Sequence, residues 1–65
     1  MTRDVERLLA EYQAAREQLY RCELALHDAH QTGVDAWITA AADRLHESIE
    51  RELTAAALVA TASRA

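Results

Sequence analysis

The sequence predicts an all-α protein: an antiparallel, coiled-coil-like two-helix hairpin that dimerises into a four-helix bundle. Three observations predict this fold class. Apolar residues follow a seven-residue repeat through the first half of the chain, Pro is absent, and the single Gly lies near the middle of the 65 residues. A heptad repeat packs one helix along a neighbour, and a chain without Pro that is interrupted once by Gly forms two helices joined by a turn.

The first predicted helix covers about residues 3–30. Thr2 is a suitable N-cap, and Asp4 follows in the first turn, where a carboxylate meets the positive end of the helix dipole. Apolar residues occupy the a and d positions of four consecutive heptads, namely Val5, Leu8, Tyr12, Ala15, Leu19, Cys22, Leu26 and Ala29. We therefore expect this row to pack against a neighbouring helix along its whole length.

The predicted turn covers about residues 31–35. Gly33 tolerates the left-handed backbone conformation that closes a helix, and either Thr32 or Asp35 is expected to cap the helix that follows. The connection is therefore short enough to hold the two helices antiparallel.

The second predicted helix covers about residues 36–61, and residues 62–65 are expected to fray. A strict heptad places Glu52 in the core, whereas a slip of one residue places Leu53 there. We expect the slip, with the apolar row formed by Trp37, Ile38, Ala42, Leu45, Ile49, Leu53, Ala56 and Ala60. The expected core then contains the larger residues of both rows, which are Val5, Leu8, Tyr12, Leu19, Leu26, Ile38, Leu45, Ile49 and Leu53.

The whole chain, residues 1–65, is expected to be one hairpin domain that is short for a self-sufficient core. Hydrophobic residues make up 51% of the chain, but many of them are Ala, which buries little area. A hairpin of this length normally completes its core by pairing with a second hairpin. Large apolar residues outside the inward rows are the expected interface, and these are Leu9, Tyr20, Leu24, Trp37 and Leu58.

Charge and hydropathy exclude several classes of partner. The net charge is −4 and the sequence has no basic stripe, so nucleic-acid binding is not expected. The longest apolar run, residues 55–60, is far shorter than the ~20 residues of a membrane span, and the N-terminus lacks a signal-peptide core. Cys22 lies in the apolar row and fits a buried, unreactive thiol. We therefore expect a cytoplasmic protein without a membrane segment.

Few residues have the chemistry of a catalytic or cofactor site, and none is predicted. Glu23, His27 and His30 share one side of the first helix and are the candidate ligands for a divalent metal. His27 and His30 also interact favourably with the negative end of the helix dipole, which explains them without a metal. Some small helical dimers bind anionic substrates through Arg side chains, and the candidates here are Arg7, Arg16, Arg44 and Arg51.

The sequence therefore predicts a non-enzymatic interaction or assembly module that acts through self-association of the hairpin. Two alternatives remain open. One is a small regulatory hairpin, antitoxin-like or anti-factor, whose core is completed by a different protein partner. The other is a metal-binding helical bundle that uses Glu23, His27 and His30. No short motif is specific enough to indicate a family.

Overall fold

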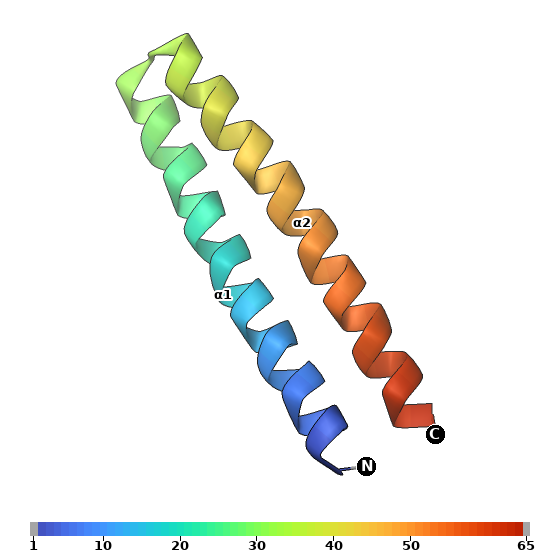
Figure 1. Ribbon diagram of the computed structural model, residues 1–65. Coiled ribbons are helices and arrows are strands. Elements are labelled where there is room, and N and C mark those ends of the chain that lie inside the picture. The colour runs from blue at the N-terminus through green and yellow to red at the C-terminus, as the bar shows by residue number, and fades with distance from the viewer. Residues whose placement is uncertain (1, 65) are drawn as a thin grey trace.

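The computed structural model describes residues 2–64, which form two long helices side by side (Figure 1). Helix α1 covers Thr2–Thr32 and helix α2 covers Asp35–Arg64. They pack antiparallel over their whole length and form a rod of 48 × 13 × 11 Å. The predicted all-α hairpin is confirmed.

Gly33 closes α1 as predicted, with a left-handed φ of 71°. Its amide donates to the carbonyl of His30 at 3.2 Å. The Thr32 hydroxyl donates to the carbonyl of Ala29 at 2.6 Å and accepts from the amide of Val34 at 3.2 Å. Thr32 therefore stabilises the end of α1 and the turn.

The cap of α2 differs from the prediction. The first backbone bonds of α2 run from the amides of Trp37 and Ile38 to the carbonyl of Val34, at 3.1 and 3.0 Å. The N-cap is therefore Val34, and the prediction of Thr32 or Asp35 was wrong. Asp35 is instead the first helical residue, where its carboxylate still interacts favourably with the helix dipole.

The helices extend beyond the predicted limits at both ends of the turn and at the end of α2. Residues 62–64 are helical and do not fray, and Ala62 is partly buried. The inward row of α2 continues to Ala62, so packing against α1 offsets the tendency of a terminus to fray. Ala65, the last residue of the predicted tail, lies outside the described residues.

The inward row of α1 follows the predicted heptads. Ala15, Cys22 and Ala29 are buried, and Cys22 is a free thiol as expected. The other five a and d residues are partly buried, and they are Val5, Leu8, Tyr12, Leu19 and Leu26. The regular repeat in the sequence therefore specified which face of α1 packs against α2.

The inward row of α2 follows the strict heptad, without the predicted slip. It consists of Ile38, Ala41, Leu45, Ser48, Glu52, Ala55, Val59 and Ala62, all buried or partly buried. Glu52 thus lies in the row, whereas Leu53 is 60% exposed and Ile49 is 37% exposed. The assignment of Trp37, Ile49, Leu53 and Ala60 to this row was wrong, because all four are exposed. A slip of one residue would rotate the apolar row of α2 away from the unbroken row of α1. The strict heptad instead keeps the two rows facing each other.

The interior of the hairpin is thin. Among residues 2–64 the buried apolar side chains are small, and they are Ala15, Cys22, Ala29 and Ala41. No large side chain in this part of the chain is completely buried. The contact between α1 and α2 therefore covers the larger apolar residues only in part.

No helix in residues 2–64 is long and apolar enough to cross a membrane.

Candidate interaction surface

Helix α2 carries a second apolar row, which we call the outer stripe. It consists of Ala42, His46, Ile49, Leu53, Ala56 and Ala60, alternately four and three residues apart. These are the e and b positions of the heptads whose a and d positions face α1. Ala42 and Ala56 are partly buried at the edge of the hairpin, and the other four residues are exposed. Helix α2 therefore has the spacing of a helix that packs on two neighbours.

The five predicted interface residues are all exposed, with exposed fractions from 41% for Leu9 to 63% for Tyr20. The structure does not gather them into one patch. Leu9 lies at an e position of α1, and e positions face each other in an antiparallel pair, so Leu9 extends the outer stripe beside Ala56. Trp37 and Leu58 lie at g positions on the opposite side of the hairpin, about 30 Å apart along α2.

Tyr20 and Leu24 form a separate pair on α1. They lie at b and f positions, which point away from α2, and they are 63% and 46% exposed. The sequence correctly indicated that these residues lie outside the core of the hairpin. It did not indicate Ile49 and Leu53, which the predicted slip had placed inside.

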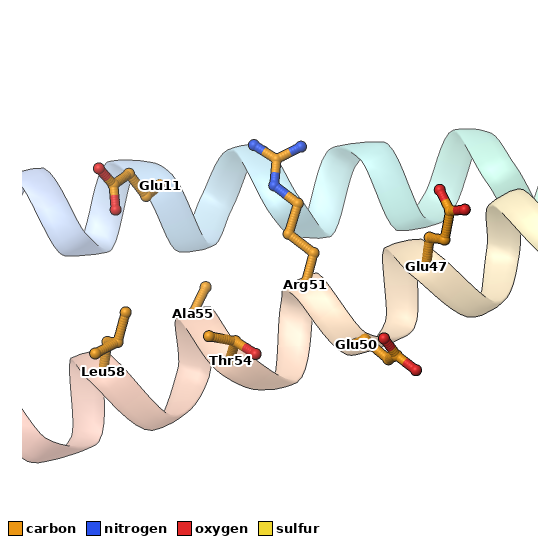
Figure 2. Close-up of a pocket in the computed structure, with 7 residues that line it drawn as sticks. All are labelled: Glu11, Glu47, Glu50, Arg51, Thr54, Ala55 and Leu58. Atoms are coloured by element: carbon orange, nitrogen blue, oxygen red, sulfur yellow. The ribbon is translucent and has the colours of Figure 1, made fainter.

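The side of the hairpin that carries the g positions is an open groove. A cavity of about 530 Å³ on this side is lined by Glu11 of α1 and by residues of α2. Figure 2 shows Arg51 extending from α2 toward α1, while Glu50 points away from α1. The remaining lining residues are Glu47, Thr54, Ala55 and Leu58. A cavity lined by three carboxylates and one guanidinium is not an anion site.

The centre of the groove contains two of the four Arg residues that the sequence offered as anion ligands. Arg44 and Arg51 line one small cavity of about 180 Å³ together with Glu47, Ser48, Cys22 and Gln18. Glu47 lies between the two Arg residues in the helix and competes with any anion for them. The Ser48 hydroxyl is buried and makes no hydrogen bond within residues 2–64. Sequence analysis did not identify Ser48, because a strict heptad was rejected for α2.

Arg16 lies apart from this pair, on the side that carries the e positions. Its guanidinium donates to the Tyr12 hydroxyl at 3.3 Å and lies 6.0 Å from the centre of the Tyr12 ring. The Tyr12 hydroxyl and, more weakly, the charge of Glu52 raise the pKa of Arg16. Arg16 is cationic at any physiological pH in either case. Arg16 therefore does not line the cavity that Arg44 and Arg51 share.

The candidate metal ligands are exposed side chains on α1. The His27 ring lies 3.4 Å from the amide nitrogen of Gln31, measured from Nε2 to Nε2. Glu23 and His30 are also exposed. Across residues 2–64 no group of three His, Cys, Asp or Glu side chains is placed to hold a metal ion. The structure thus does not assemble Glu23, His27 and His30 into a metal site.

Comparison with protein-family models, curated proteins and solved structures found no match for this chain.

Proposed function

We propose that the chain is a non-enzymatic assembly module that acts by self-association, with two hairpins forming a four-helix bundle. The observation that carries this proposal is the surface area of the hairpin. A compact monomer of 7.3 kDa exposes about 4,200 Å², whereas this hairpin exposes 5098 Å². The excess of roughly 900 Å² is close to the ~800 Å² that each partner contributes to a standard protein interface.

The composition of the exposed surface supports the same proposal. Among residues 3–64, eight large apolar residues are exposed while the buried apolar residues are Ala and Cys. Water would contact more large apolar side chains than the hairpin buries, which is unfavourable for an isolated chain. A second copy is always present at the same concentration as the first and carries the same apolar faces. Self-association therefore requires no further component.

The test is the mass of the purified chain in solution, measured by light scattering over a hundredfold range of concentration. We expect a species of twice 7.3 kDa that dissociates only at the lowest concentrations. Circular dichroism on the same samples should show that helix content falls as the dimer dissociates, because part of the core is lost. A helical monomer at every concentration would contradict the proposal and would assign the exposed faces to a different protein.

A further inference from the structure

We infer that two copies of the hairpin pair through their outer stripes, with the two α2 helices antiparallel and a two-fold axis between Ile49 and Leu53. This inference rests on the proposed self-association and adds the surface and the direction of pairing. The outer stripe extends from Ala42 to Ala60, about 27 Å along α2. It is therefore long enough for a continuous helix–helix contact.

The order of residue sizes in the stripe fits a two-fold axis. In an isologous interface each residue of one copy meets its counterpart across the axis. An axis midway between Ile49 and Leu53 places Ile49 opposite Leu53 of the second copy and His46 opposite Ala56. It also places Ala42 opposite Ala60. The large side chains thus meet at the centre and the small ones at both ends, so the two helices can approach evenly.

The parallel alternative is less favourable. Parallel pairing along the same stripe would place His46 against His46 of the second copy and would align the two helix dipoles. Antiparallel pairing places each His46 against an Ala and opposes the dipoles. It also brings Leu9, which lies beside Ala56, close to His46 of the second copy. The second copy would then shield this large apolar side chain of α1 from water.

Charge at the rim of the stripe gives a distinguishing consequence. Glu50 is exposed, points away from α1 and lies at an f position next to the stripe. Under antiparallel pairing the two Glu50 side chains come close to the axis on the same rim. Glu50→Gln is therefore expected to tighten the dimer about twofold at low salt, since like charges across an interface repel.

The first experiment compares two Asp substitutions on α2 by the light-scattering series. Leu53 lies in the stripe, and Leu58 is a matched control because it is also exposed, at 48%, but lies on the groove side. Leu53→Asp is expected to weaken the dimer by at least about a hundredfold, because an unpaired carboxylate would be buried at the axis. Leu58→Asp should change the dissociation constant by less than about threefold, as for a substitution outside the interface. Equal effects of the two substitutions would overturn the inference.

The second experiment reports the direction of pairing even where Leu53→Asp unfolds the chain. In a Cys22→Ala background, single variants Ile49→Cys and Leu53→Cys are oxidised separately and as a mixture. We expect a disulfide-linked dimer only in the mixture, where position 49 meets position 53. Linkage of each variant with itself, or no linkage in the mixture, would overturn the inference. If the unmodified chain is dimeric, self-association stands in either case; if it is monomeric, the proposed function itself fails.

Discussion

The two helices of this hairpin use their apolar residues differently. In α1 most of the larger apolar residues lie in the inward row, namely Val5, Leu8, Tyr12, Leu19 and Leu26. Leu9, Tyr20 and Leu24 lie outside this row and are exposed. In α2 the inward row includes Ser48 and Glu52 at its centre, while Ile49 and Leu53 lie beside them in the outer stripe and are exposed. Helix α1 thus places most of its larger apolar residues against α2, whereas most of the larger apolar residues of α2 lie outside its inward row.

This difference indicates that α1 and α2 respond differently to substitution. A change in the inward row of α1 removes the main apolar contribution to the hairpin. A change in the inward row of α2, at Ser48 or Glu52, removes a polar group that the hairpin accommodates at a cost. The following substitutions test this contrast, from the largest expected effect to the smallest.

Leu19→Asp is expected to unfold the hairpin. Leu19 is a partly buried member of the α1 row, and a carboxylate there would face the interior without a partner. We expect a loss of about 3 kcal/mol or more in the free energy of unfolding, which is a large part of the stability of so small a chain. Circular dichroism, which reports helix content, measures the unfolding of the variant. Leu24→Asp is the control, since Leu24 is exposed and should tolerate the change. Equal loss in both variants would contradict the assignment of Leu19, and not Leu24, to the inward row of α1.

Ser48→Ala is expected to stabilise the protein by about 1 to 2 kcal/mol. The Ser48 hydroxyl is buried without a hydrogen bond in the described part of the chain, and Ala removes this cost and favours helix. Urea denaturation measures the gain. Ser63→Ala on the exposed end of α2 controls for helix propensity and should gain no more than a few tenths of a kcal/mol. If Ser48→Ala destabilises, the hydroxyl has a partner that supports the fold.

Glu52→Leu is expected to stabilise the hairpin by about 1 kcal/mol. Glu52 is partly buried in the α2 row, and Leu there would bury apolar area against α1. The favourable charge interaction of Glu52 with Arg16 is lost, but Arg16 is exposed, so the loss is small. Thermal unfolding measures the difference, with Glu17→Leu on the outward face of α1 as the control. A lower melting temperature for Glu52→Leu alone would show that Glu52 supports the hairpin.

The fold was largely predictable because the sequence of α1 has a regular apolar repeat. Its heptads are regular, and Gly33 has the predicted left-handed conformation, so the number of helices, their direction and the buried face of α1 followed from the sequence. The capping of α2 did not follow. A backbone carbonyl, that of Val34, accepts the first bonds of α2, and any residue type supplies such a carbonyl.

The outer stripe could not be found from α2 alone. Within α2, a row that contains Leu53 is more apolar than one that contains Glu52, so local hydrophobicity favours the slip. The outcome depends on α1, whose unbroken row requires an unbroken row opposite. The predicted row of α2 mixed residues of the inward row with residues of the outer stripe, so Ile49 and Leu53 were not among the predicted interface residues.

Helix α1 begins and helix α2 ends at the same end of the rod, opposite the turn (Figure 1). A tag joined near residue 2 and a tag joined near residue 64 would therefore emerge side by side. Under the inferred antiparallel pairing, the tags of the second copy would emerge at the other end, separated from the first pair by about 40 Å at a rise of 1.5 Å per residue. The dimer would then work as a short spacer that holds two attached domains apart.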